Sequence, residues 1–357
     1  MAWLSGWDNR IKLTIDNTKI DSELSHFPVT VVLSSTHGDC VFDELTSNAN
    51  RTKIAFTKSD GTTQLYGEIE EWDDANESAV IHVSLSGWSI SSSADTDFYM
   101  YYDSGHAANT TYIGDIDSTP GHSVWDSNFK FVCHMVDATT STVKDSTSNG
   151  NDGTKGAANN PIEATGKIGK GQDFGGHSSI TFSSYLFNAN ADYTIFVIFN
   201  QESYSFKDVL FHQYPYYNHF LTFSDVLTND DLSVRAESDS SWDNFGRVLE
   251  VPFDTYKAVT FTRASDYSYG FNDGVKGTGY AVGTFGGTGS GGSTLGYFSN
   301  RGFYGIIDEC RISNSARSDA WIKATYNTLW DTLLTYGSEE TDSGGVTENA
   351  VFFGMAF

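Results

Sequence analysis

The sequence predicts an all-β protein of two antiparallel β-sandwich, jelly-roll-like domains, with one short helix after the last strand of the second domain. Apolar and polar residues alternate along short segments such as residues 10–16, and similar segments recur along most of the chain. Glycine is abundant and proline scarce, at 34 and 5 residues, a balance that suits many tight turns. The 357 residues exceed what one ordinary core needs, so we expect two domains.

The first hundred residues supply the strands of the first domain. Residues 29–33 are apolar except for Thr30, as in the interior of a sandwich, and Ser59-Asp60-Gly61 separates two alternating segments as a hairpin turn does. The series closes at residues 97–103. Residues 104–128 then lose the apolar pattern and are rich in turn residues. We therefore expect a first domain over residues 1–105 and a linker over residues 106–128.

A second series of strand-like segments predicts the second domain, over residues 129–337. One helix follows it: Ser318 suits the N-cap, Asp319 the first turn and Gly337 the C-terminal cap. Its apolar positions recur at helical spacing: Ile322, Tyr326, Leu329 and Leu333. The glycine-rich residues 283–293 lack the Lys-Ser/Thr and the following helix of a phosphate-binding loop, so we interpret them as a loop tip.

The chain ends in a polar linker and an apolar tail, residues 338–357. The tail's large apolar side chains are Val351, Phe352, Phe353, Met355 and Phe357. Burying them is worth several kcal/mol at about 25 cal/mol per Å². Two interpretations stay open: a last strand on the chain's own sheet, or a peptide that docks into a neighbouring subunit by strand addition.

Charge and composition exclude several classes of protein. The net charge of −25 disfavours a nucleic-acid partner. It reflects either a solvated surface or carboxylate clusters that bind calcium. Three cysteines form no disulfide framework. No signal peptide and no apolar run long enough to span a membrane is visible, so we expect no membrane insertion. A virion component fits these features; a surface protein whose leader has been removed is the alternative.

Two family resemblances support this organisation. Residues of about 5–103 resemble the domain-of-unknown-function family numbered 2341, and this resemblance implies an architecture but no activity. Its matching segments are Trp7 and Arg10 before KLTID, Phe27-Pro28-Val29, VFDEL at 41–45, KIAFTKSDGTTQLYGEIEEWD and DTDFYMYY. Residues of about 129–336 look like a laminin-G or concanavalin-A-type jelly roll. The segments that carry this second resemblance are HMVD, DSTSNGNDGT, GKIGKGQDFGG, YTIFVIF and GIIDECRISNSARSDAWIKATY.

Catalytic patterns are weak. Sandwich glycoside hydrolases need two carboxylates at a controlled separation on one sheet face. Glu68 and Glu70 share a strand face, but we interpret that face as solvent-exposed, and the adjacent Asp308 and Glu309 are expected to point to opposite faces. His134 and His212 are interpreted as structural histidines rather than metal ligands. We therefore expect no enzymatic activity, with a carbohydrate-active enzyme as the alternative.

Calcium is the one ion that the sequence favours. Asp145-x-Thr147-x-Asn149-Gly150 places oxygen side chains at alternate positions before a glycine bend. By resemblance, lectin-like sandwiches bind calcium at a rim with such a loop and a distant acidic residue. The predicted ligands are Asp137, Asp145, Asn149 and Asp308. A turn stabilised by its own side chains, without an ion, is the alternative.

Ligand binding is expected at aromatic side chains on exposed loops, since these stack on sugar faces. The candidates are Tyr214, Tyr216, Tyr217 and Trp242. Together with the resemblances, they favour a fibre, tail-tip or capsid-decorating protein of a virus, which binds neighbouring virion subunits, forms homo-oligomers and contacts host-surface glycans or proteins. A cell-surface adhesin of a bacterium or archaeon is a further alternative.

Overall fold

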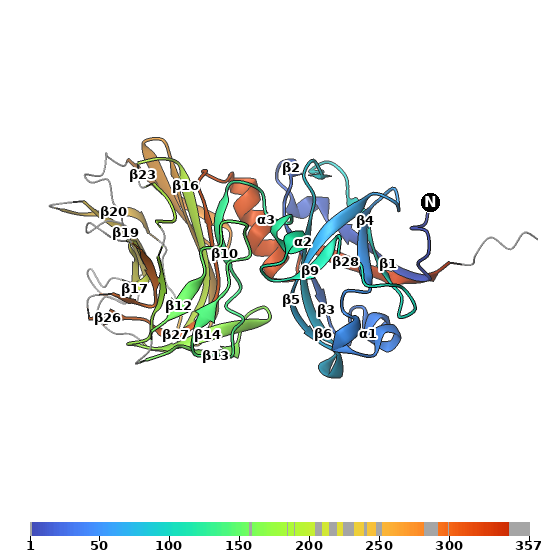
Figure 1. Cartoon of the computed structure of the whole chain (residues 1–357). Helices are drawn as coiled ribbons and strands as arrows, with labels where there is room; N and C mark the ends of the chain where they lie inside the picture. Colours follow the sequence, from blue (N-terminus) through green and yellow to red (C-terminus); the bar gives the residue numbers. More distant parts are fainter. Residues whose placement is uncertain are drawn as a thin grey trace, which may run out of the picture.

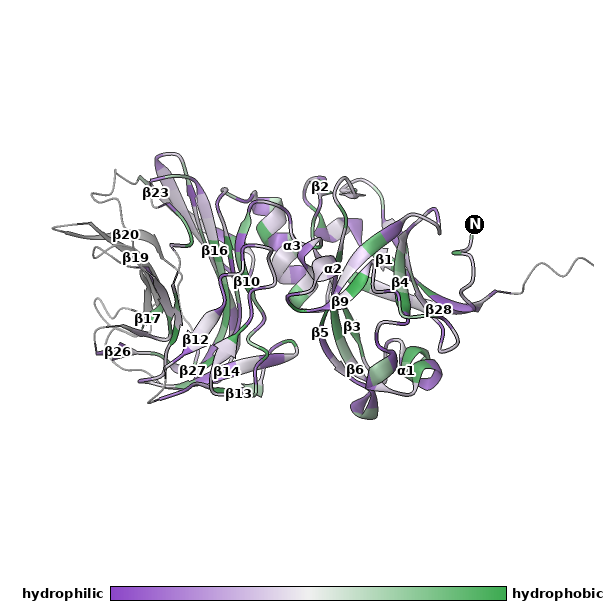
Figure 2. Ribbon diagram, viewed as in Figure 1, coloured by the Kyte–Doolittle hydropathy of each residue, from purple (hydrophilic) through white to green (hydrophobic). Residues whose placement is uncertain are grey.

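The computed structural model describes residues 2–156, 159–183, 185–188, 190–203, 209–213, 220–223, 232–238, 241–247, 252–281, 292–298 and 300–342; for 220–223, 232–238, 241–247 and 298 it describes the backbone. These residues form two β-rich lobes joined by a waist that contains helices α2 and α3 (Figure 1). Hydrophobic and hydrophilic residues are mixed along the strands of both lobes (Figure 2). The prediction of an all-β, sandwich-like fold with a short helix after the second domain's last strand is confirmed.

The first lobe is built from residues at both ends of the described chain. Its elements are β1 (Asn9–Ile15), β2 (Leu24–Ser25), β3 (Val29–Leu33), α1 (Asp39–Leu45), β4 (Ile54–Lys58), β5 (Gln64–Asp73), β6 (Ser78–Ser84), β7 (Ser89–Ile90), β8 (Thr96–Tyr102), β9 (Ile113–Asp115), α2 (Thr119–His122) and β28 (Leu334–Thr341). One eight-stranded sheet runs in the order β28-β1-β8-β4-β5-β6-β3, with β9 added parallel to β5. The sheet curls around a core that includes Leu13, Phe56 and Ile81.

The second lobe is a sandwich of two sheets. Its elements are β10 (Phe129–Cys133), β11 (Thr142–Val143), β12 (Gly153–Lys155), β13 (Ile162–Thr165), β14 (Lys170–Gly175), β15 (Ile180–Phe182), β16 (Tyr193–Gln201), β17 (Val209–Gln213), β18 (Phe220–Phe223), β19 (Leu232–Ser238), β20 (Ser241–Arg247), β21 (Tyr256–Ala264), β22 (Tyr267–Asn272), β23 (Val275–Ala281), β24 (Ser293–Leu295), β25 (Tyr297–Phe298), β26 (Arg301–Gly302), β27 (Tyr304–Ser313) and α3 (Asp319–Leu329). We call β13-β14-β27-β16-β21-β22-β23, with β10, the inner sheet, and β11-β12-β15-β24-β17-β18-β19-β20 the outer sheet. Between them lie Phe131, Val197 and Phe211.

Strand β28 changes the domain boundaries that the sequence predicted. It pairs antiparallel with β1, so the chain leaves the second lobe after α3 and completes the sheet of the first. Gly337 therefore lies inside a strand and does not cap the helix, and residues 338–341 are strand rather than polar linker. The predicted linker 106–128 contains β9 and α2, which pack on β5. The second lobe is thus an insertion within the first.

Helix α3 lies between the lobes. Ser318 caps it by accepting a hydrogen bond from the Trp321 backbone N–H, as the sequence predicted, and the helix ends at Leu329. Leu329 packs in an apolar cluster that joins Val80 of the first lobe to Phe196 and Ile198 of the inner sheet. No described helix has the length and apolar character needed to cross a membrane. The three cysteines are free.

Candidate functional site

Buried polar side chains gather where the inner sheet meets the first lobe. We call this group the interlobe cluster; its members are Glu68, Glu70, His82, Trp125, His134, Asp308, Glu309 and Arg311. Glu68, Glu70 and His82 come from β5 and β6, and the others come from the residues before and after β10 and from β27. All eight are buried. A concentration of ionisable groups in a protein interior is costly unless the charges are compensated, so the cluster is a candidate functional site.

Strand β5 places Glu68 and Glu70 on the face opposite the core of the first lobe. Ile69 points into that core, and Glu68 points away from it. A register shift between Ile69 and Glu71 makes Glu70 the extra residue of a β-bulge. The prediction that this face is solvent-exposed is wrong: Glu68 is 0% and Glu70 4% exposed, because the second lobe covers them.

Strand β27 contains a matching irregularity. Ile198 pairs with Glu309 and Phe199 with Ile307, so Asp308 is the extra residue of a bulge. Ile307 and Cys310 point into the core of the second lobe. Asp308 and Glu309 lie between these two core residues, and Asp308 contacts the Ile168 backbone while Glu309 contacts His134, so both carboxylates face the first lobe and the expectation that they point to opposite faces is wrong.

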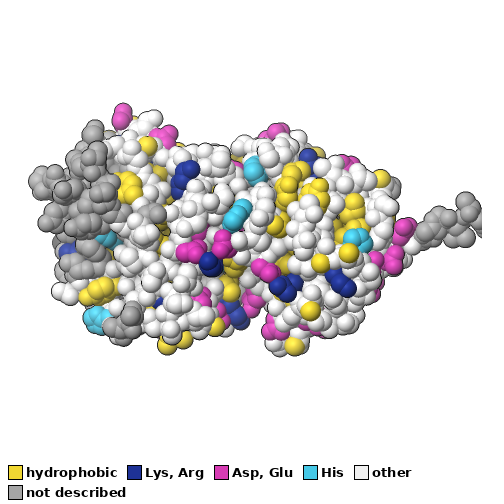
Figure 3. All heavy atoms as spheres, in the orientation of Figure 1, with side chains coloured by type: hydrophobic (Ala, Val, Ile, Leu, Met, Phe, Trp, Pro, Cys, Tyr) yellow, Lys and Arg dark blue, Asp and Glu magenta, His cyan; other side chains and the backbone are white. Residues whose placement is uncertain are grey.

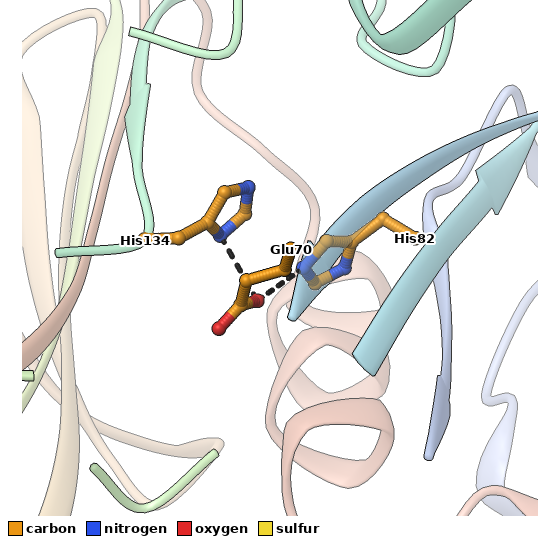
Figure 4. Close-up of side chains that lie close together, drawn as sticks. All are labelled: Glu70, His82 and His134. Atoms are coloured by element: carbon orange, nitrogen blue, oxygen red, sulfur yellow. Dashed lines mark hydrogen bonds and ion pairs between the residues drawn. The ribbon is translucent and has the colours of Figure 1, made fainter. Parts of the chain in front are cut away.

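His134 is the centre of the cluster. Its Nδ1 lies 2.9 Å from Glu309 Oε2 and 3.3 Å from Glu70 Oε2, and its Nε2 lies 3.5 Å from Glu68 Oε2. His82 Nε2 lies 2.7 Å from the same Glu70 oxygen. Glu70 thus lies between two histidines, one from each lobe (Figure 4). The two imidazole rings stack with their centroids 4.5 Å apart.

A second set of contacts fixes the orientation of these side chains. Thr30 Oγ1 lies 3.1 Å from His82 Nδ1, which directs Nε2 of that ring toward Glu70. The Trp125 indole N–H donates to Glu68 Oε2 over 2.6 Å. Arg311 donates to Glu309, and its guanidinium lies 4.9 Å from the centre of the Trp125 ring. The cluster is therefore held in a defined geometry from both lobes.

The pKa values in the cluster are shifted in opposite directions. Burial raises the pKa of Glu70 well above its ordinary value, despite the opposing effect of His134. Burial and the neighbouring Glu309 likewise raise the pKa of Asp308. Burial would also raise the pKa of Glu309, but Arg311 and His134 outweigh it and hold that pKa low. Burial lowers the pKa of His82, whereas Glu309 and Glu70 overcome burial and raise that of His134.

Several polar atoms of the cluster lack a hydrogen-bond partner among the described residues. They are Glu68 Oε1, Glu70 Oε1, His134 Nε2, Asp308 Oδ1 and Arg311 Nη2. Buried polar atoms are almost always satisfied, so this concentration is unusual. In the described part of the chain, one set of at least three His, Cys, Asp or Glu side chains has all its ligand atoms within 4.8 Å of one another: Glu70, His82 and His134.

An open hollow of about 330 Å³ on the surface of the first lobe borders the cluster at Glu70, whose side chain itself has no exposed surface. Glu70, Glu71 and Trp72 line it on one side, and Arg51 and Asp115 on another. Arg51 and Asp115 form a two-pronged ion pair, with Nη2–Oδ2 at 2.7 Å. Acidic, basic and histidine side chains are also visible at the junction of the lobes (Figure 3).

The predicted calcium ligands lie in separate local networks. Asp145 accepts hydrogen bonds from the backbone N–H groups of Val132, Thr147 and Asn151. Asn149 belongs to the same turn and donates to the Phe129 carbonyl. Asp137 pairs with Lys155 at 3.1 Å. Asp308 accepts from the N–H groups of Lys167 and Ile168. Calcium at these residues stays a prediction.

The predicted ligand-binding and docking residues fall mostly outside the described chain. Trp242 lies in strand β20 of the outer sheet, where the backbone alone is described. Tyr214, Tyr216 and Tyr217 lie outside the described residues, between β17 and β18 in the sequence. The tail residues Val351, Phe352, Phe353, Met355 and Phe357 also lie outside them.

Sequence reasoning missed the cluster because its residues come from distant segments. One signal was present: charged residues interrupt apolar strands in GEIEEWD, IHV, CHM and DECRI. An ionisable residue between aliphatic neighbours on a strand indicates burial against another surface as readily as exposure to solvent.

No known protein family matches the chain, and no curated protein matches it. Among solved structures, the chain is similar to domain 4 of AbnA, an extracellular arabinanase from Geobacillus stearothermophilus solved with arabinotriose (20% identity, 55% of this chain and 97% of that one, TM-score 0.47). It is also similar to the binding domain of Paraclostridial mosquitocidal protein 1 (12% identity, 56% of this chain and 52% of that one, TM-score 0.45). A third match is the binding domain of botulinum neurotoxin DC, solved with rat synaptotagmin II (11% identity, 57% of this chain and 52% of that one, TM-score 0.45). The chain thus spans about half the length of the two toxin chains. The two family resemblances drawn from the sequence stay predictions.

Proposed function

We propose that this chain is a non-enzymatic adhesion protein of a virion surface, in which the first lobe is the base and the outer sheet of the second lobe is the binding surface. The base would contact neighbouring virion subunits and further copies of the chain. The outer sheet would bind glycans of a host surface.

The observation that carries this proposal is the insertion of the second lobe into the first. Strands β1 and β28 lie side by side, and the Asp342 backbone N–H donates to the Asp8 carbonyl over 2.8 Å. Both ends of the described chain therefore lie on the first lobe, and any segment joined to either end would attach there. The outer sheet lies on the side of the second lobe away from the first (Figure 1).

A fixed orientation between the lobes suits a displayed binding surface. Arg317 forms a two-pronged ion pair with Asp126, with both N–O distances at 2.6 Å, and its guanidinium lies 4.4 and 4.2 Å from the centres of the Phe129 and Trp321 rings. The apolar cluster around Leu329 and the interlobe cluster add buried contacts on either side. The second lobe, which we call the head, loses less conformational entropy on binding a ligand when its orientation on the first lobe is already fixed.

The predicted ligand residues belong to the part of the sequence that forms the outer sheet. Trp242 lies on β20, and Tyr214, Tyr216 and Tyr217 fall between β17 and β18 in the sequence. Aromatic rings stack on the apolar faces of sugars, and neighbouring amides and carboxylates bind the hydroxyls. A carbohydrate-active enzyme is less well supported, because Glu68 and Glu70 are enclosed between the lobes, where a polysaccharide does not fit.

The proposal is tested by measuring binding of the purified full chain to immobilised glycans of diverse composition. We expect saturable binding to a subset of glycans, and loss of most of that binding in Trp242→Ala or in a triple Tyr214/Tyr216/Tyr217→Ala variant. Tyr267→Ala, which removes a half-exposed aromatic ring from the inner sheet, is the matched control and should bind normally. Release of reducing sugar from any bound glycan would contradict the non-enzymatic assignment.

The proposed place of the chain on a virus particle needs a separate test. Antibody raised against the first lobe and labelled with gold should decorate disrupted particles, and antibody against the second lobe should decorate intact ones. Absence of the chain from purified particles would contradict the virion part of the proposal, while leaving a glycan-binding role intact.

A further inference from the structure

We propose that Glu70, His82 and His134 bind one divalent transition-metal ion of the zinc class, which clamps the two lobes together. This site goes beyond the proposed binding function: it concerns how the base holds the head. Glu70 and His82 belong to the first lobe, on β5 and β6, and His134 follows β10 of the second.

The donor set suits such an ion. Two imidazoles with a carboxylate are a common ligand combination for zinc and for iron(II). Glu70 Oε2 lies 2.7 Å from His82 Nε2 and 3.3 Å from His134 Nδ1. Atoms with these separations can share an ion at bond lengths of about 2.0–2.2 Å after small side-chain rotations. Glu309 Oε2, 2.9 Å from His134 Nδ1, offers a fourth ligand.

The surroundings of these side chains resemble an outer coordination shell. Metal-binding histidines usually have the other ring nitrogen hydrogen-bonded, and binding carboxylates are themselves held in place. Thr30 contacts the far nitrogen of His82, and Glu68 faces the far nitrogen of His134. Arg311 holds Glu309. Each candidate histidine therefore presents one nitrogen to Glu70 while a polar group faces the other.

Two independent observations indicate that a cation is needed. Glu70 Oε1 is fully buried and has no hydrogen-bond partner among the described residues. In addition, the cluster contains four buried carboxylates, those of Glu68, Glu70, Asp308 and Glu309, but one guanidinium, that of Arg311, which pairs with Glu309. Buried carboxylates are either protonated or compensated by a cation, and a bound divalent ion would compensate those that Arg311 and His134 leave uncompensated.

The candidate ligands are enclosed. The hollow of about 330 Å³ borders Glu70 at the protein surface, but the Glu70 side chain has no exposed surface, and Glu71 and Asp115 beside the hollow are paired with Lys170 and Arg51. An ion at this site would therefore be bound as the lobes come together. A set of ligands and an organised outer shell are two of the features that a metal site must combine.

The first experiment uses the unmodified full chain. Purified protein is stripped with a chelator, and Zn²⁺ is added back while metal content, thermal unfolding and titration heat are measured. We expect one Zn²⁺ per chain and an increase in the unfolding temperature that saturates at one equivalent. Absence of stoichiometric binding, or binding without any stabilisation, would overturn the proposal; protons would then neutralise the cluster.

Variants then test whether the ion occupies this site. Glu70→Gln and His82→Gln should each abolish the stoichiometric binding, and Thr30→Val, which removes an orienting contact, should weaken it by about 10–100-fold. His122→Gln alters a half-buried histidine that pairs with Asp117 outside the cluster and is the matched control. Unchanged zinc binding in Glu70→Gln would overturn the assignment. Substituted Co²⁺ in the unmodified chain gives a visible spectrum that reports nitrogen ligation, and circular dichroism of each variant distinguishes a folded but metal-free chain from an unfolded one.

Discussion

Glu70 of the first lobe and His134 of the second lie in direct contact, with Oε2 and Nδ1 3.3 Å apart and both side chains buried. Glu70 lies on β5, His134 directly follows β10, and each side chain points away from the core of its own lobe. Strand β28 returns the chain to the first lobe, so the second lobe is attached to the first at both of its ends, and an apolar cluster around Leu329 also packs between the lobes. The lobes therefore form one structural unit, although their strands form separate sheets.

Removing β28 should destabilise the first lobe. A chain that ends at Leu333 loses the strand that covers β1, together with the ion pair between Arg10 and Glu340 at 2.6 Å. An unpaired edge strand also promotes association. We expect that chain to unfold at a much lower temperature and to aggregate, whereas a chain that ends at Asp342 should unfold like the full protein. Equal stability of the two truncated chains would contradict the insertion topology.

The apolar contact between the lobes should contribute strongly to stability. Ile198 is fully buried against the first lobe, so Ile198→Ala leaves a cavity there and should lower the free energy of unfolding by about 2–4 kcal/mol. Ile162, which is 71% exposed, is the matched control. Ile162→Ala should change the free energy of unfolding by less than about 0.5 kcal/mol. Urea denaturation measures both values, and similar losses in the two variants would argue against a packed interface.

The ion pair that precedes α3 should behave as a buried pair. Asp126→Asn leaves Arg317 without its charge partner at a position where both side chains are largely buried. We expect a loss of about 3 kcal/mol, since an uncompensated buried charge is costly. Lys323→Met removes the exposed pair with Asp21 and should cost less than about 1 kcal/mol. A small effect of Asp126→Asn would show that Arg317 is solvated.

Acidification should weaken the second lobe through His212. Burial lowers the pKa of this histidine to about 4. The unfolded chain, with an ordinary pKa near 6.5, then binds the proton more readily than the folded chain does. Neutral His212 therefore leaves the free energy of unfolding at its full value above about pH 6.5. As the pH falls toward 4, the free energy of unfolding decreases by about 3 kcal/mol in total.

The matching measurement compares unfolding free energies of the unmodified chain and His212→Gln between pH 7 and pH 4. The free energy of unfolding of the unmodified chain should fall toward that of His212→Gln as the pH falls, because the variant has no histidine at this position to protonate. A constant difference for His212→Gln across the range would contradict the prediction.

The strands were predictable because each one carries its own signal. Alternation at residues 10–16 and the apolar run at 29–33 correspond to β1 and β3, and the helix start at Ser318 was read from its N-cap. Strand pairing has no such local signal. The sequence of β28 contains glycine and glutamates and does not show that β1 is its partner.

The interlobe cluster was missed for a related reason. A period of two assigns side chains to faces, and a bulge shifts that assignment by one residue, as at Glu70 and Asp308. The pattern also does not show what covers a face. Glu68 and Glu70 were placed on one face correctly, but the second lobe occupies the position that was assigned to solvent.

The central claim, that inserted and clamped lobes unfold as one body, is tested most directly by calorimetry of the full chain. We predict a single transition whose calorimetric and van't Hoff enthalpies agree. Two separate transitions, one for each lobe and with enthalpies that sum to the whole, would contradict it.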